Sequence, residues 1–221
     1  HASYRSVGSA RTARGSPLGI AMSVSSSGPD DTEAEFGLAE RILDEASRLF
    51  AERGWAATSL REIAEAAGCT KPALYYHWGN KEALFLAALR RETGRLTEVI
   101  DASLANDEST LEDQLIQGLR ALFETLERSP RGMALLKGAE LRPDPHQPKF
   151  DFVGLRQRNQ EAIRTLIAGG IARGEARDDV PLDDLVHGLT GLVDMRIQHW
   201  LQGAPLDSDL PERLVCLFLQ G

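Results

Sequence analysis

Four consecutive residues, Tyr75 to Trp78, carry two phenol hydroxyls, an imidazole and an indole within the run CTKPALYYHWGNKEALF. Tyr hydroxyls and a His ring can hydrogen-bond to phosphate oxygens, and a small side chain such as Ala73 lets a helix lie close to base edges or thymine methyl groups. If the segment is helical, these side chains cannot all face one core. The run therefore predicts a surface that can meet a nucleic-acid duplex.

The charge of the chain restricts where such a surface can lie. The 221 residues carry a formal net charge of −8, so the molecule as a whole repels a polyanion. From Ala66 to Lys81 there is no carboxylate, and Lys71 and Lys81 add positive charge. Lys81 also falls in the first turn of an expected helix, where free backbone N–H groups can bind phosphate. Nucleic-acid binding is expected at this local patch.

The orientation of these side chains follows from an expected short helix. Thr70 is a good N-cap and Pro72 is tolerated in the first turn, so the helix is expected to run to Trp78. Leu74 and Trp78 lie four residues apart and share a face, which makes them the natural core pair. The outward and flanking positions are then Thr70, Lys71, Ala73, Tyr75, Tyr76 and His77. Taken alone, the segment is equally compatible with packing against a neighbouring domain.

The elements that position this helix are also predicted to be helical. Apolar residues recur at three- and four-residue steps from Leu38 to Phe50, and Gly54 offers a helix end. Ser59 and Glu62 have capping-box spacing and open the next helix, while Gly79 and Asn80 separate the third helix from a fourth that begins at Lys81. Further helices are expected near 109–127, 129–139, 150–173, 181–202 and 207–219. The fold class is all-α.

The remaining composition bounds the class of protein. Residues 1–32 are rich in Ser, Gly and Ala and contain Arg5, Arg11 and Arg14, so they are expected to form a flexible basic arm. The arm is either a solvated leftover, with Met22 as a native start and a vector-derived segment before it, or an extension that reaches DNA. Two cysteines are too few for a disulfide scaffold. Without a secretory signal or an apolar run of membrane-spanning length, a soluble cytoplasmic protein is expected.

The block ILDEASRLFAERGWAATSLREIAEAAGCTKPALYYHWGNKEALFLAAL closely resembles the N-terminal domain of the TetR (tetracycline-repressor) family of bacterial transcription regulators. The matching motifs are RLFAERG, ATSLREIAEAAGC and KPALYYHWGNKEALF, in register over residues 38–87. The resemblance implies a three-helix helix-turn-helix DNA-binding domain at 33–80, with the third helix as recognition helix. A larger helical bundle for ligand binding and dimerisation is implied at 81–221.

The family's DNA contacts carry over to positions of this sequence that match its motifs. They are Thr58, Ser59, Arg61, Thr70, Lys71, Ala73, Tyr75, Tyr76, His77 and Lys81. One departure is Cys69, where an aliphatic residue is commoner in the family. Because nothing nearby would lower its pKa much, Cys69 is interpreted as a small buried hydrophobe, with a redox sensor as the alternative.

Apolar residues form a stripe on each of the last two expected helices, 181–202 and 207–219, and these stripes support a dimer independently of the resemblance. Gly188 and Gly191 would allow a second helix to approach closely, and two helices from each subunit would close a four-helix interface. The alternative is that the stripes only bury the core of one protomer. The residues predicted at the interface are Leu185, Leu189, Leu192, Val193, Ile197, Trp200, Leu214 and Phe218.

A pocket for an unknown small-molecule effector is implied by the family and only weakly indicated by the residues. Phe123, Met133, Phe150, Phe152 and Arg156 are the candidates, each with ordinary core packing as its alternative. His187 and His199 lie twelve residues apart on one expected helix, which does not place them on a common metal. Neither a metal nor another cofactor is expected.

These observations lead to one principal function. We expect a homodimeric repressor that binds a pseudo-palindromic double-stranded DNA operator and is released by a ligand, with no membrane association. A regulator without small-molecule control, or an activator, is the first alternative. An enzyme is a remote one, because the sequence shows no nucleophile–base motif, phosphate loop or metal-ligand spacing.

Overall fold

The computed structural model describes residues 29–105 and 109–220, and within them every regular element is a helix. The sequence-based boundaries agree with the observed ones to within a few residues. The helices are α1 (Pro29–Arg53), α2 (Leu60–Ala66), α3 (Lys71–Trp78), α4 (Lys81–Leu104), α5 (Leu111–Arg128), α6 (Pro130–Leu141), α7 (Phe152–Ala172), α8 (Leu182–Leu201) and α9 (Leu210–Gln220). The prediction of an all-α fold is confirmed. The arm prediction concerns residues 1–32; α1 begins at Pro29, and residues 1–28 lie outside the described part.

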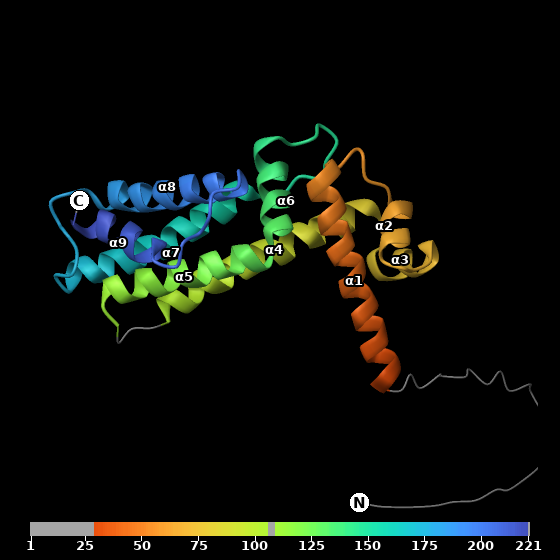
Figure 1. Ribbon diagram of the computed structural model, residues 1–221, viewed down its shortest axis with the longest axis horizontal. Coiled ribbons are helices and arrows are strands. Elements are labelled where there is room, and N and C mark those ends of the chain that lie inside the picture. Colours follow the sequence, from red (N-terminus) through yellow and green to blue (C-terminus); the bar gives the residue numbers. More distant parts are fainter. Residues whose placement is uncertain (1–28, 106–108, 221) are drawn as a thin grey trace, which may run out of the picture.

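The helices form two bodies joined by α4 (Figure 1). We call α1, α2, α3 and the first half of α4 the head, and the second half of α4 with α5, α7, α8 and α9 the bundle. The head lies at the right of Figure 1, and the N-terminal end of α1 extends away from it. Helix α6 lies between the two bodies and packs against both α1 and α4.

The N-terminal ends of α2, α3 and α4 are each fixed by a side-chain cap. Ser59 accepts a hydrogen bond from the Glu62 amide at 3.3 Å, and the Ser59 amide donates to the Glu62 carboxylate at 2.9 Å, so the predicted capping box is present. Thr70 caps α3 and Asn80 caps α4 through the amides of Ala73 and Ala83. Because the cap residues stand at fixed positions, they set where α3 begins and ends relative to its neighbours.

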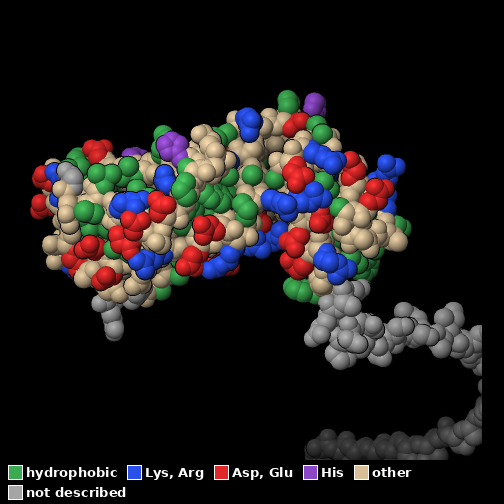
Figure 2. All heavy atoms as spheres, in the orientation of Figure 1, with side chains coloured by type: hydrophobic (Ala, Val, Ile, Leu, Met, Phe, Trp, Pro, Cys, Tyr) green, Lys and Arg blue, Asp and Glu red, His purple; other side chains and the backbone are tan. Residues whose placement is uncertain are grey.

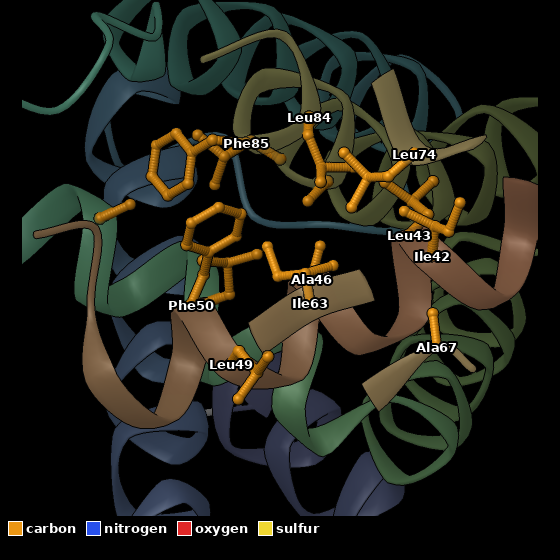
Figure 3. Packing of buried hydrophobic residues seen from close by; sticks show 14 of the residues in the cluster. Ile42, Leu43, Ala46, Leu49, Phe50, Ile63, Ala67, Leu74, Leu84 and Phe85 are labelled. Carbon is orange, nitrogen blue, oxygen red and sulfur yellow. The ribbon is translucent and has the colours of Figure 1, made fainter. Parts of the chain in front are cut away.

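The core of the head is tightly built around aromatic rings. The ring of Phe85 meets those of Phe50 and Trp55 edge-on, with centroids 4.9 and 5.1 Å apart. Figure 3 shows Phe50 and Phe85 facing each other, with Leu74 and Leu84 extending the same core. This packing holds α3 against α1 and α4.

Helix α6 contributes to the head core through buried residues, Leu135, Leu136 and Ala139. A polar hub then ties α6 to α4. The Glu92 side chain is only 4% exposed, and its carboxylate accepts hydrogen bonds from Ser129 at 2.9 Å and Arg95 at 3.1 Å. The neighbouring Arg91 donates to Asp44 of α1 at 2.7 Å. Consecutive residues of α4 therefore link α1 to the start of α6.

The bundle has its own core, formed by α5, α7, α8 and α9. Its buried members include Leu111, Leu119, Phe123, Ile167, Val186 and Val215. Gly170 allows α5 and α7 to meet closely, because a Cβ there would collide with the Leu111 side chain. The bundle is thus a separately packed unit.

Candidate functional site

Helix α3 presents its aromatic side chains as the sequence predicted. Leu74 is fully buried in the head core and Trp78 packs half-buried against it. Tyr76 is 76% exposed and Tyr75 is 44% exposed. Water-exposed tyrosines in adjacent positions leave both hydroxyls free to meet a partner, since the anchoring of α3 does not use them.

The neighbours of the two tyrosines hold their rings in place. The Tyr76 ring meets His77 edge-on at 5.3 Å, and the Lys71 ammonium lies 5.6 Å above the Tyr75 ring. His77 and Ala73 are half-buried, while Thr70 and Lys71 are exposed. The six predicted positions on or beside α3 therefore form one continuous surface with positive charge at one end.

The carboxylates that border this surface are partly engaged. Glu62 pairs with Arg53 at 2.8 Å, and Glu65 lies 3.5 Å from the guanidinium of Arg61. Hydrogen bonds from the Ser59 hydroxyl and amide lower the pKa of Glu62. The lowered pKa keeps Glu62 ionised, and the guanidinium groups of Arg53 and Arg61 offset the negative charge that a phosphate would meet beside α2.

Thr58 does not fit a direct contact through its side chain. The residue is 2% exposed, and its hydroxyl donates to the carbonyls of Gly54 at 2.9 Å and Leu49 at 3.2 Å. The hydroxyl of the contact residue expected at Thr58 is thus engaged within the head, whereas the neighbouring Ser59 is exposed. Thr58 closes the turn between α1 and α2, so it shapes the surface from below.

Lys81 is also directed inward rather than toward the α3 surface. Its ammonium donates to the Trp55 carbonyl and lies 4.3 Å above the centre of the Trp55 ring. Burial in this position lowers the pKa of Lys81, and the charge of Asp144 opposes that effect. The expected phosphate-binding ammonium is thus engaged in holding the α1–α2 connection to the start of α4.

Cys69 lies half-buried against the head core, and burial raises the pKa of its thiol. A raised pKa disfavours the reactive thiolate. The interpretation as a small hydrophobe therefore fits its surroundings better than that of a redox sensor.

The bundle contains a cavity of about 440 Å³ between α4, α5, α7 and α8. Most of its lining is aliphatic, with Leu96, Ile100, Leu115, Leu119, Ile163 and Leu166 among the contributors. In Figure 2 hydrophobic side chains gather in a hollow between α6 and α8, over the bundle. A volume of this size accommodates a small organic molecule.

The predicted pocket residues divide into two groups. Met133 and Arg156 line the cavity. Phe123 does not: it is buried in the bundle core. The tilted rings of Phe150 and Phe152 meet with centroids 4.8 Å apart and pack against the head core, and neither residue lines the cavity. Aromatic type misled the prediction, because the cavity is walled by aliphatic residues spaced along four helices.

The predicted interface residues also divide. Leu185, Leu189 and Ile197 are buried in the bundle of a single protomer, and Leu189, Val193 and Ile197 line the cavity. The other predicted positions, Leu192, Val193, Trp200, Leu214 and Phe218, are half-buried. The three buried residues pack in the core of one protomer, which is the alternative that the sequence analysis gave for these stripes.

Helix α8 nevertheless leaves an outward face. Met195 and, on α9, Leu217 are exposed large apolar residues. Gly188 and Gly191 lie exposed on α8, and a Cβ added at either would meet open space. The exposed face of α8 thus includes the two glycines that the sequence analysis placed at a helix contact, beside the more buried leucines of the predicted stripe.

Two other kinds of feature are absent from the described residues. Across 29–105 and 109–220, no helix has both the length and the apolar character needed to cross a bilayer. In the same part of the chain, no group of three or more His, Cys, Asp or Glu side chains is arranged to hold a metal ion.

Comparison with known proteins agrees with this geometry. Residues 42–88 match the family described as bacterial regulatory proteins, tetR family, and residues 105–217 match the tetracyclin repressor-like C-terminal domain. The chain is 30% identical over 178 residues to the transcriptional repressor AcnR of Corynebacterium glutamicum, which covers 76% of this chain and 85% of the relative. It is 27% identical to the repressor KstR2 of Mycolicibacterium smegmatis, over 82% of this chain and 88% of the relative.

A solved structure supports the same fold. The TetR-family regulator PfmR from Thermus thermophilus superimposes with a TM-score of 0.67 at 24% identity, covering 82% of this chain and 98% of that protein. The N-terminal family match falls on the helix-turn-helix head, and the C-terminal match falls on the helical bundle. The chain belongs to the TetR family and is a DNA-binding regulator of transcription, not an enzyme.

Proposed function

We propose that the protein is a homodimeric repressor whose affinity for a pseudo-palindromic operator falls when a small molecule enters the bundle cavity. The observation that carries this proposal is the path of α4. Leu84 and Phe85 of this helix lie in the head core, whereas Leu96 and Ile100 of the same helix line the cavity. A ligand that displaces the cavity wall acts on a rigid element that also holds the head.

The proposed DNA contacts come from the exposed surface around α3. Ser59, Arg61, Thr70, Lys71, Ala73, Tyr75, Tyr76 and His77 are accessible, in whole or part, for phosphate or base contacts. Thr58 and Lys81 instead stabilise the frame beneath that surface. Phosphate contacts would fix register, and the helix surface at Ala73 and Tyr76 would read bases in the major groove.

A dimer is needed for the operator that we propose. Two recognition helices related by a two-fold axis read half-sites whose centres lie about 34 Å apart along the duplex. The exposed face of α8, with its two glycines and Met195, and the exposed Leu217 of α9 support a helix-to-helix contact with a second protomer. An isologous contact of this kind closes at two subunits.

Release from the operator then follows if ligand binding in the cavity is coupled to DNA binding by the head. A ligand that binds better to a dimer with another head separation lowers DNA affinity by a coupling free energy of about 1–3 kcal/mol. The sign of regulation is supported by the relatives, since AcnR and KstR2 are both named repressors.

The test is selection of bound sequences from a pool of randomised duplexes with the full chain. We expect enrichment of a pseudo-palindrome with half-site centres about one helical turn apart. Tyr76→Ala should change the preferred sequence. Lys71→Ala should weaken all sequences alike and reduce the salt dependence of binding by about one counterion.

Arg128→Ala is the matched control for charge, because Arg128 is exposed on α5, remote from α3. It should leave both preference and salt dependence unchanged. Failure to enrich any sequence at low ionic strength would overturn operator binding, and enrichment of single half-sites alone would overturn the dimer.

A further inference from the structure

The chemistry of the cavity wall restricts which effector it can accept, and this inference rests on the function proposed above. Among the described residues that line the cavity, the ionisable ones are Arg156, His187 and Asp194. Arg156 forms an ion pair with Glu140, and Asp194 forms one with Lys137. Helix α6 thus supplies an opposite charge to each, while His187 lies exposed on α8.

This pairing argues against a charged ligand. An anion would have to compete with Glu140 for Arg156, and a cation would have to compete with Lys137 for Asp194. Placing an unpaired charge deeper among the aliphatic side chains would carry a large desolvation cost. The wall therefore favours an uncharged molecule.

The hydroxyl groups on the wall are already committed as donors. Ser103 donates to the Val99 carbonyl at 3.0 Å, and Thr190 donates to the Val186 carbonyl at 2.8 Å. Each retains lone pairs that can accept a hydrogen bond. These groups consequently favour a donor on the ligand.

Asn159 adds a second, independent indication. Its side-chain oxygen is buried, and it has no hydrogen-bond partner in the part of the chain that the structure describes. The residue is half-buried on α7 and lines the cavity. A buried amide oxygen without a partner carries a desolvation cost, and because this oxygen is closed off from the cavity, a ligand O–H group reaches it once the Asn159 side chain turns toward the cavity.

We propose that the effector is an uncharged, largely aliphatic molecule bearing one hydroxyl, which donates a hydrogen bond to Asn159. The aliphatic part fills the space between α4, α5 and α7, and the hydroxyl ends at the polar side of the wall. The amide group of Asn159 can also donate, so a hydroxyl can form both hydrogen bonds with it.

The inference is tested with three ligands of equal chain length: dodecan-1-ol, dodecanoate and dodecylammonium. Binding to the full chain is measured by calorimetry without DNA at submicellar concentrations. We expect the alcohol to bind at least about tenfold more tightly than either ion, since each ion must either lose its hydration as a charged group or give up its charge at a cost in free energy. Asn159→Leu should weaken binding of the alcohol about five- to tenfold.

Gln157→Leu is the matched control, because Gln157 lies on the same helix but is exposed and does not line the cavity. It should bind the alcohol as the natural chain does. Tighter binding of either ion, absence of alcohol binding, or an unaltered alcohol affinity in Asn159→Leu would each overturn the inference. Since no DNA is present, such a failure leaves operator selection untouched, and the selection experiment separately tests the proposed function.

Discussion

The head and the bundle solve different packing problems with the same kind of element. In the head, three aromatic rings meet within 4.9–5.9 Å and fill the space between short helices. In the bundle, longer helices line a partly open cavity of about 440 Å³ with mostly aliphatic side chains. A recognition surface must be held at a fixed geometry, whereas a ligand site must retain volume at a cost in packing.

The largest expected difference concerns the removal of a large core side chain. Phe85→Ala should cost about 3–5 kcal/mol of unfolding free energy, because the lost ring leaves a void among Phe50 and Trp55. Leu122→Ala, on the half-buried cavity wall, should cost clearly less, since that side chain already borders empty space. Urea unfolding of both variants measures the difference. Equal losses would show that the bundle is packed as tightly as the head.

The junction between the two bodies should be the next most sensitive place. At Gly132 of α6, an added methyl group would collide with the Glu92 carboxylate and come within 2.5 Å of the Ser129 hydroxyl. Because Ser129 and Arg95 hold that carboxylate, Gly132→Ala should cost about 1–3 kcal/mol.

The matched control is Gly138→Ala on the same helix, where a Cβ meets open space. It should instead stabilise by about 0.5–1 kcal/mol through higher helix propensity. Thermal unfolding of the two variants gives opposite signs if α6 is held by the polar hub. A neutral Gly132→Ala would mean that Glu92 can move aside.

What the sequence could predict follows the same division between head and bundle. Capping residues and glycines act locally, so Ser59, Thr70 and Gly79 were enough to predict the positions of α2 and α3 correctly. Helical spacing likewise identified Leu74 as buried and Tyr76 as outward. The head was predictable because its signals lie within a few residues of their effects.

Tertiary partners were not predictable from the same signals. The Trp55 carbonyl that holds Lys81 lies twenty-six residues away in the chain. Helical periodicity shows that Leu185 and Leu189 share a stripe, but not whether that stripe faces its own protomer or another. Phe150 lies just before α7 and Phe152 is its first residue, so both fall outside the periodic part of that helix and no local pattern could direct them to the head core.

A smaller effect is expected at Thr58, which supports the α1–α2 turn and does not belong to the exposed surface around α3. Thr58→Val keeps the shape but removes the hydroxyl, leaving the carbonyls of Gly54 and Leu49 without that donor. A loss of about 1 kcal/mol in unfolding free energy is expected, with no change in the preferred DNA sequence. Urea unfolding together with duplex selection provides the measurement. An altered sequence preference at unchanged stability would restore Thr58 to the contact surface.

The smallest effect concerns the pH dependence of the α2 cap. Hydrogen bonds from Ser59 lower the pKa of Glu62 in the folded protein, so the stabilisation that they provide is present above the unfolded pKa and is lost as pH falls through the folded value. Ser59→Ala removes the hydroxyl cap and should cost about 0.5–1 kcal/mol near neutral pH. The gap in unfolding free energy between this variant and the natural chain, measured by urea unfolding across pH, should then narrow in acid, because protonated Glu62 is a poorer acceptor.

Thr110 provides the control for that prediction, since it caps α5 in the bundle and bonds to Asp113 instead of Glu62. If the gap for Thr110→Ala narrowed over the same acidic range to the same extent, the pH dependence would belong to capped helices in general. If the difference in unfolding free energy between Ser59→Ala and the natural chain stayed constant with pH, the pKa of Glu62 would not depend on the Ser59 hydroxyl. Either result would mean that the pH dependence of Ser59→Ala does not report the hydrogen bonds between Ser59 and the Glu62 carboxylate.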